Sequence, residues 1–514
     1  MTPKGSSPAA TRHWPESILL WSLALVVTFA GLTPLLGLGL LGDDLVDYSY
    51  GLGQLWSGSL ISHVSSMVGN ANAGLHVLPI VGIARALHNQ AASTLATTPL
   101  SVSQSWELLR VVWIIAGLVA CSLTISAWTP LTRLPARLAR HRTLIAYSIL
   151  SAVALATMQI HGVWSQDPVL SYSVFSWFSA VLGFAFFAAL GVVWRQSGRA
   201  AWRWSFAAAA IGITGILVYE SVAAALVAGF GAMLLLIFLT WEGRQSLRRA
   251  LPVMVATLVP LGVFAAVQLY RTRMPSTYDG TQFGWVAWIL PVWKTGLLGG
   301  LPLTNYPLTM ETTSGYDPGL HSSIAAPAAV ALLFVITWVA YRRGRNLGPQ
   351  VPVQIGWKAI AAVVSFCFAY WALATLVFST TAKYQMEIET TVGRIYLFYS
   401  VALLCISVVL TMLALVFMAR GWRAAIAAFV IAVLGLGIVQ WNVNARSLSR
   451  IHADFAWTRT LLDGVENDLP SSTRSQACRP LRELVLPDWY SGGTMAGLDT
   501  AYQARFGEPF CPPE

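Results

Sequence analysis

Residues 17–41 have the sequence SILLWSLALVVTFAGLTPLLGLGLL, and the acidic stretch Gly42-Asp43-Asp44 follows directly. The apolar run contains no charged residue, and about 20 apolar residues suffice to cross the hydrocarbon core of a bilayer. It is also longer than the apolar core of a cleaved signal peptide. It therefore predicts a first transmembrane helix over Ser17–Leu41, with an acidic pair where this helix leaves the membrane.

Further apolar runs of similar length follow along the chain. The segment from Ser205 to Trp241 is too long for one helix, so we split it at Tyr219-Glu220-Ser221. Of the 514 residues, 56% are hydrophobic and 11% charged, whereas roughly a quarter are charged in soluble domains. The sequence predicts an all-α polytopic membrane protein with about eleven transmembrane helices. The further spans are Leu109–Leu131, Leu144–His161, Leu170–Trp194, Ser205–Tyr219, Ser221–Trp241, Val253–Tyr270, Ile324–Tyr341, Ile360–Phe378, Ile395–Met418 and Ala424–Trp441.

Basic residues cluster in the connections between alternate spans, and all clusters fall on one side of the predicted topology. The positive-inside rule assigns that side to the cytoplasm. The formal net charge of +10 therefore reflects topology, and we expect no nucleic-acid partner. The N-terminus is predicted to be cytoplasmic and the C-terminus extracytoplasmic. The clusters are Lys4 and Arg12, Arg133 to Arg142, Arg195 to Arg203, Arg244 to Arg249, Arg342 to Arg345, and Arg420 with Arg423.

Two long connections are predicted on the extracytoplasmic side. The first, residues 42–108, mixes apolar and polar residues in a pattern typical of helices that lie at the membrane interface. The second, residues 271–323, contains the apolar, Trp-bearing segment Phe283–Leu301, which is predicted to be re-entrant or interfacial.

The spans and their loops form one predicted transmembrane module, residues 1–441. Residues 442–514 form a small extracytoplasmic C-terminal region. Cys478 and Cys511 lie in this region, where an oxidising compartment would permit a disulfide between them.

The acidic pair Asp43-Asp44 is the strongest local signal of chemistry. Carboxylates at a membrane boundary are well placed to act as a general base or as metal ligands. The structural alternative is that they cap a helix end that faces water. The aromatic and glycine residues that follow, Tyr48, Tyr50 and Gly51, open a long amphipathic loop and favour the functional interpretation.

An apolar first span, an immediate acidic pair, a long first loop and a many-helix bundle resemble the GT-C superfamily of polyprenyl-phosphate-sugar-dependent glycosyltransferases. The similarity is to bacterial members, such as O-antigen glucosyltransferases and actinobacterial arabinofuranosyltransferases. It implies an inverting enzyme of the bacterial inner (plasma) membrane. It also implies that Asp43 or Asp44 activates a hydroxyl of a glycan, lipid or protein acceptor.

Two further acidic residues are candidates for contacting substrate. Asp167 precedes a proline before the fourth span and could bind acceptor or metal; an Asp-Pro turn that starts a helix is the structural alternative. Glu220 lies between two apolar spans, where a carboxylate is by default a functional-site hypothesis. A tight turn at the outer surface would also explain it.

A lipid-phosphate donor needs cations near the outer leaflet, because Arg and Lys bind phosphate oxygens. The alternative is that each candidate cation pairs with a nearby carboxylate. Arg271 and Arg273 would then pair with Asp279, and Lys383 and Arg394 with Glu387 or Glu389. Glu387 is also a candidate for substrate contact. Tyr278 and Tyr396 could pack against a sugar or prenyl chain, or they could anchor the membrane interface. The candidate cations are Arg271, Arg273, Lys383 and Arg394.

A divalent cation could assist the departing phosphate, but no sequence motif specifies its ligands. Three histidines of the first loop, His63, His76 and His88, have no metal-ligand spacing and are predicted to be interfacial polar residues. The alternative is that one of them binds a metal together with the acidic pair. The alternative functions are a polysaccharide polymerase or ligase, and a transporter of lipid-linked sugars. Few charged residues lie deep in the predicted spans, which disfavours the transporter.

Overall fold

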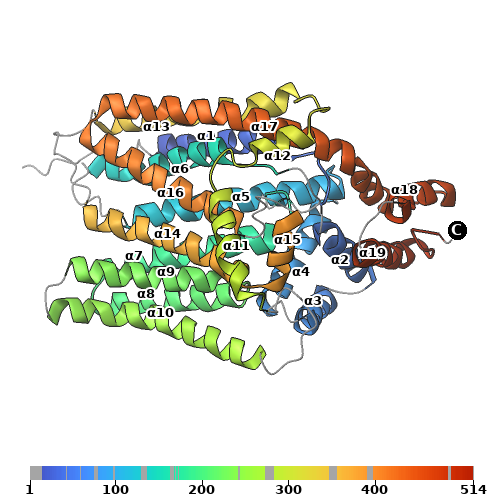
Figure 1. The fold of residues 1–514 in the computed structure, drawn as a ribbon, viewed down its shortest axis with the longest axis horizontal. Helices are drawn as coiled ribbons and strands as arrows, with labels where there is room; N and C mark the ends of the chain where they lie inside the picture. The colour runs from blue at the N-terminus through green and yellow to red at the C-terminus, as the bar shows by residue number, and fades with distance from the viewer. Residues whose placement is uncertain are drawn as a thin grey trace, which may run out of the picture.

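The computed structural model describes residues 14–41, 43–57, 60–74, 79–96, 99–128, 136–161, 167, 169–171, 173–240, 244–271, 283–345, 356–390, 398–483 and 488–512. Apart from one isolated bridge between Phe283 and Thr381, the regular structure in these ranges is helical. The long helices run side by side, and short helices gather at the end of the bundle that also holds the C-terminus (Figure 1).

Nine helices in the described ranges are long and apolar enough to cross a bilayer. This confirms the prediction of a helical, multi-pass membrane protein. The nine helices are α1 (Trp14–Leu32), α5 (Val102–Trp128), α7 (Ser179–Arg195) together with the π-helical turn before it (Ser173–Phe178), α9 (Ser221–Leu239), α10 (Arg244–Arg271), α13 (Leu320–Arg345), α14 (Trp357–Ser379), α16 (Tyr399–Arg420) and α17 (Arg423–Val465).

Two other helices coincide with predicted spans but are not among the nine. These are α6 (Ala136–Thr157) and α8 (Gly198–Ile216). Both contain arginines in their first turns, which lowers their mean hydropathy. Both nevertheless pack within the bundle, α6 against α13 and α8 against α7. A total of eleven crossings stays a prediction.

The division at Tyr219-Glu220-Ser221 is confirmed, because α8 ends at Ile216 and α9 begins at Ser221. The helix of the last span does not end at Trp441, and where the crossing ends stays a prediction. Helix α17 continues to Val465 without interruption over 43 residues, or roughly 65 Å at the α-helical rise. Its second half therefore extends beyond the length that a bilayer needs.

Two predicted spans are shorter than expected. The first helix ends at Leu32 instead of Leu41, and a short 3₁₀ turn over Thr33–Leu35 follows. Pro34 lies in this turn, and Gly37 and Gly39 adopt positive φ angles of 86° and 81°, which a continuing helix excludes. Helix α6 likewise ends at Thr157, and the chain continues to His161 without helical structure.

Described arginines near the last turns of α7, α13 and α16 lie at the end of the bundle opposite the short helices. Arg343, near the end of α13, lies 3.6 Å from Glu16 at the start of α1. The turns from α7 to α8 and from α16 to α17 lie at this same end (Figure 1). These positions agree with the positive-inside rule for the connections between long helices, whereas further arginines, Arg474 and Arg482 of α18 (Ser471–Glu483), lie at the opposite end. Which compartment each end faces stays a prediction.

The predicted first loop is helical and forms a cap together with the C-terminal helices. The cap has its own hydrophobic core, to which α2 contributes Tyr48 and Leu52, and α19 contributes Leu498 and Tyr502. The cap helices are α2 (Asp43–Ser57), α3 (Leu60–Gly74), α4 (Pro79–Leu95), α18 (Ser471–Glu483) and α19 (Asp488–Phe506). Three more short helices, α11 (Val286–Gly299), α12 (Tyr306–Thr312) and α15 (Ala382–Thr390), come from later connections.

Glycines allow α2 and α19 to approach closely. A Cβ atom added to Gly497 of α19 would lie 2.5 Å from the backbone carbonyl carbon of Ser49. One added to Gly53 of α2 would lie 3.0 Å from the carbonyl oxygen of Gly497. The C-terminal helix therefore rests directly on the helix that begins at the acidic pair.

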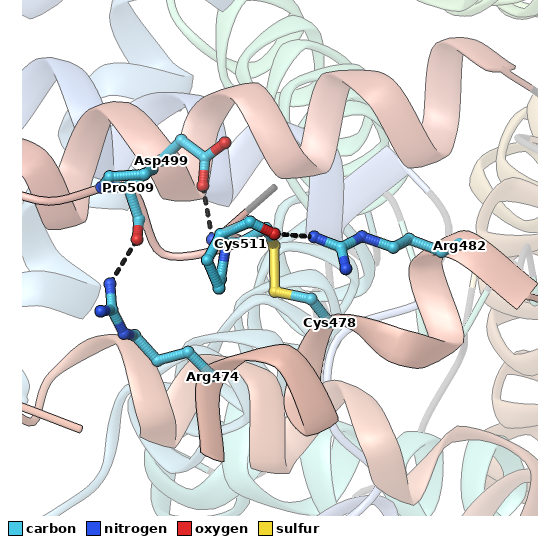
Figure 2. Close-up of a disulfide and its surroundings, with 7 residues drawn as sticks. Arg474, Cys478, Arg482, Asp499, Pro509 and Cys511 are labelled. Atoms are coloured by element: carbon cyan, nitrogen blue, oxygen red, sulfur yellow. Dashed lines mark hydrogen bonds between the residues drawn. A yellow bond between two sulfur atoms is a disulfide. The ribbon is translucent and has the colours of Figure 1, made fainter. Parts of the chain in front are cut away.

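A disulfide joins Cys478 of α18 to Cys511 after α19, as Figure 2 shows. The backbone N–H of Cys511 donates to Asp499 at 2.7 Å, and the Arg474 guanidinium donates to the carbonyl of Pro509. The last described residues are thus folded back onto α18. This is the cysteine pair that the sequence places in the C-terminal region.

Candidate active site

Asp44 lies in the first turn of α2, and its side chain is buried, with 5% of the residue exposed. The side chain of Asp43 and the whole of Gly42 lie outside the described residues. Asp47, one turn further along α2, forms an ion pair with Arg85 of α4. The ion pair holds α2 against α4, while Asp44 faces the interior.

The chain segment that leads to Asp44 is held by α5. The carboxylate of Glu107 accepts hydrogen bonds from the backbone N–H groups of Gly37 and Gly39, both at 2.6 Å. The guanidinium of Arg110 donates to the carbonyl of Gly39 at 3.2 Å. Because an unpaired backbone group costs free energy when buried, these two side chains replace the helical bonds that the segment lost.

The same segment is also held from the other side by α17. His452 Nδ1 lies 3.1 Å from the carbonyl oxygen of Gly37, and the Arg459 guanidinium donates to this oxygen at 3.2 Å. A Cβ at Gly39 would lie 2.4 Å from Thr458 Oγ1. The position of Asp44 therefore depends on a segment clamped between α5 and α17.

Arg110 is completely buried, and three acidic side chains attract its charge: Glu107, Asp44 and Asp167. Each of these acids is at most 5% exposed. We call these four residues the Arg110 cluster. It brings together two residues that the sequence analysis singled out, Asp44 and Asp167. A buried charge is tolerated only when it is compensated. Here the guanidinium donates to the carbonyls of Leu35 and Gly39 and is attracted by the three carboxyl groups.

The sequence analysis missed Glu107 and Arg110. Arg110 lies at the start of the predicted span Leu109–Leu131, and an ionisable residue in such a span is by default a functional-site hypothesis. That signal was present in the sequence. Its partners were not visible there, because Asp44 and Asp167 lie 66 and 57 residues away along the chain.

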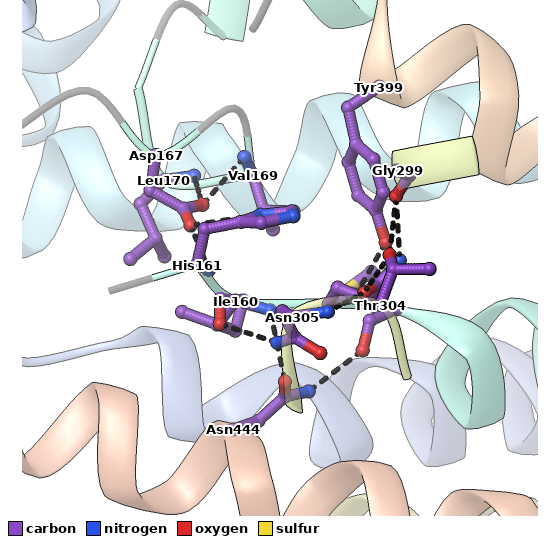
Figure 3. Close-up of polar contacts among 12 residues, drawn as sticks. Ile160, His161, Asp167, Val169, Leu170, Gly299, Thr304, Asn305, Tyr399 and Asn444 are labelled. Carbon is purple, nitrogen blue, oxygen red and sulfur yellow. Dashed lines mark hydrogen bonds and ion pairs between the residues drawn. The ribbon is translucent and has the colours of Figure 1, made fainter. Parts of the chain in front are cut away.

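Asp167 is held in place by backbone groups. Its Oδ2 accepts from the N–H of His161 at 2.6 Å, and its Oδ1 accepts from the N–H groups of Val169 and Leu170 at 2.8 and 3.2 Å (Figure 3). The Oδ2 atom also lies 3.7 Å from His161 Nδ1. The bonds to Val169 and Leu170 agree with the predicted Asp turn, and the burial and the imidazole are additional features.

Two of the three first-loop histidines, His63 and His88, are described, and both are buried within the protein; their position relative to the membrane interface stays a prediction. His88 Nδ1 accepts a hydrogen bond from Trp113 Nε1 at 3.2 Å. Burial, together with the positive charge of Arg110, lowers the pKa of His88 to about 3. Burial also lowers the pKa of His63. Both rings are therefore neutral at physiological pH, and His76 lies outside the described residues.

No protein-family model matches this chain. No curated protein matches its sequence either. The residues themselves therefore carry the functional argument.

The proposed phosphate-binding cations lie mostly outside the described part of the chain. Lys383 is half-buried in α15, and Arg271 is the last residue of α10. The side chain of Arg271 and the whole of Arg273 and Arg394 lie outside it, as do Tyr278, Tyr396 and the side chain of Glu387.

Glu220 is half-buried in the turn between α8 and α9. Its place agrees with the structural alternative of a tight turn, and its contact with substrate stays a prediction. Among the described residues, no three His, Cys, Asp or Glu side chains are grouped closely enough to bind a metal ion. The binding of a divalent cation also stays a prediction. Asp43, whose side chain lies outside the described residues, is a candidate ligand.

Proposed function

We propose that this protein is an inverting glycosyltransferase of the bacterial inner membrane that uses a polyprenyl-phosphate sugar as donor. The observation that supports this most is the placement of Asp44. It is a buried carboxylate just beyond the first apolar helix, and its charge interacts with that of Arg110, as does the charge of Asp167. The sequence resemblance to the GT-C superfamily points in the same direction.

In the proposed reaction, Asp44 accepts the proton of an acceptor hydroxyl. The hydroxyl oxygen forms a bond to the anomeric carbon while the bond from that carbon to the phosphate oxygen breaks. The lipid phosphate leaves with the bonding electrons. Proton removal by a positioned carboxylate accelerates such a step by about 10²–10⁴-fold.

The Arg110 cluster suits this role for an electrostatic reason. Arg110 favours the ionised form of a neighbouring carboxylate, and the ionised form is the one that can accept a proton. Asp167 uses both of its oxygens to bind backbone N–H groups. We therefore assign proton transfer to Asp44 and a positioning role to Asp167.

The departing phosphate requires positive charge, which we assign to Lys383 with Arg271, Arg273 and Arg394. In the proposed topology these residues and the cap face the extracytoplasmic side, and the basic end faces the cytoplasm. The acceptor, which is a glycan, lipid or protein, then approaches from the cap side.

The test is a transfer assay with the purified protein in proteoliposomes. The donors are radiolabelled polyprenyl-phosphate hexoses and pentoses, and the acceptors are bacterial envelope glycolipids and polysaccharides. We expect covalent transfer by the wild type and a loss of about 100-fold or more for Asp44→Asn. The matched control is Asp454→Asn, because Asp454 is a partly exposed carboxylate of α17 that pairs with Arg450.

Full transfer by a variant with both Asp43→Asn and Asp44→Asn would refute the proposed mechanism. Movement of labelled lipid across the vesicle membrane without covalent transfer would favour the transporter. Transfer only from lipid-diphosphate oligosaccharides would favour the polymerase or ligase.

A further inference from the structure

Residues 158–161, which follow the end of α6, are embedded in a network of buried amide side chains. Gln159 accepts from the N–H of Asn305 at 3.0 Å and donates to the carbonyl of Leu301 at 2.8 Å. Asn444 of α17 accepts from the N–H of Ile160 at 3.0 Å and donates to the carbonyl of Met158 at 2.8 Å. These side chains replace the helical bonds lost after Thr157.

The amides of this network are all paired. Asn305 donates to the carbonyl of Ile160 at 2.9 Å and accepts from Gln440 at 3.2 Å. Gln440 also donates to Asn444 and accepts from the N–H of Leu303. Buried polar groups in folded proteins are normally satisfied in this way.

His161 is the exception in this network. The residue is only 6% exposed, and neither of its ring nitrogens has a hydrogen-bond partner among the described residues. The 3.7 Å from Nδ1 to Asp167 Oδ2 is too long for a hydrogen bond. The edge-to-face contact with Tyr399, at 5.3 Å between ring centroids, fixes the plane of the imidazole without satisfying its nitrogens. The ring lies beside the Asp167 carboxylate in Figure 3.

We propose that the imidazole of His161, beside Asp167, forms a subsite that binds a hydroxyl group of the transferred sugar. This inference rests on the proposed glycosyl transfer and adds a residue that determines donor specificity. A neutral imidazole has one donor and one acceptor nitrogen, and a hydroxyl group likewise both donates and accepts. An anionic phosphate fits less well, because Asp167 is adjacent and would repel it. Bonds that are long in the free enzyme commonly shorten when substrate binds.

The test compares donors with and without individual sugar hydroxyls. Each deoxy-sugar donor is assayed with the wild type, with His161→Phe, and with the control His321→Phe. His321 is an exposed histidine whose ring lies 3.1 Å from Thr33 Oγ1. Thermal unfolding is measured for every variant. Because phenylalanine removes two buried unpaired nitrogens, His161→Phe should unfold at the wild-type temperature or above it.

We expect one deoxy donor to lower the wild-type kcat/KM about 10-fold, as the loss of one hydrogen bond predicts. His161→Phe should be slower than the wild type by a similar factor with the full donor, and should not distinguish that donor from the deoxy donor. His321→Phe should retain the full discrimination.

If the deoxy donor lowers the kcat/KM of His161→Phe by the same factor as that of the wild type, the subsite is refuted and the proposed glycosyl transfer stands. If His161→Phe unfolds far below the wild type, the histidine has a structural role and the subsite is likewise refuted. If the wild type transfers no sugar from any polyprenyl phosphate, the proposed function fails, and the subsite fails with it.

Discussion

Replacing Gly497 with alanine tests whether the C-terminal helix positions the helix that carries Asp44. An alanine Cβ at this position would meet backbone atoms of Ser49 and Tyr50 at 2.5 and 2.6 Å. Backbone atoms cannot move aside as a flexible side chain can, so α19 must shift away from α2. Overpacking of this kind costs about 1–3 kcal/mol.

The same substitution also has a favourable term, because alanine stabilises a helix relative to glycine by about 0.5–1 kcal/mol. Replacing Gly492, in the same helix, with alanine measures this stabilising contribution by itself. Nothing lies within 4 Å of a Cβ added there. We therefore expect Gly492→Ala to stabilise the cap slightly and Gly497→Ala to destabilise it, with a difference of about 2 kcal/mol between the two variants.

Two measurements check this difference, namely thermal unfolding in one detergent and hydrogen exchange over α2. Gly497→Ala should unfold at a lower temperature, exchange faster over Asp43–Ser57 and transfer less sugar. Gly492→Ala should do none of these. If Gly497→Ala proves as stable as Gly492→Ala and α2 exchanges at the wild-type rate, the close contact between α2 and α19 is not what holds α2.

Two further substitutions test the charges around the site. Glu107→Gln removes the negative charge beside Arg110 and weakens the bonds to Gly37 and Gly39, which should cost about 3 kcal/mol in unfolding measurements. Glu16→Gln, which alters only an exposed pair with Arg343, should change stability by less than about 0.5 kcal/mol. Equal effects of the two variants would contradict a stabilising role of the bonds from Glu107 to Gly37 and Gly39. Burial and Asp463 raise the pKa of Glu466 from 4.5 to about 7, so the folded state holds this proton more tightly than the unfolded state. The wild type should therefore lose stability as pH rises from about 4.5 to about 7. The free energy of unfolding of Glu466→Gln should fall less over this range, as measured at pH 5 and pH 8. The control Asp468→Asn, at an exposed position, should show the same pH dependence as the wild type.

The sequence alone was sufficient to predict the class of this protein and much of its helical order. A run of apolar residues long enough to cross a bilayer is a local property, so the nine long helices were predictable from composition and length. The break at Glu220 and the collection of basic clusters at one end are local properties as well. The sequence also placed Asp44 just beyond the first apolar span and marked Asp167 as a candidate, although it did not show that both interact with Arg110.

Only the tertiary structure decided where several helices end and how the site is assembled. Helix α6 stops at Thr157 because Asn444, far along the chain, satisfies the backbone that follows. Pro34 and the glycines after it end the first helix, but it is Glu107 of α5 that binds the N–H groups of Gly37 and Gly39. The Arg110 cluster combines residues from three separate segments. Hydropathy along the chain measures whether a segment can enter a membrane, but a buried charge is stabilised by whichever groups surround it in space, and distant parts of the chain supply those groups.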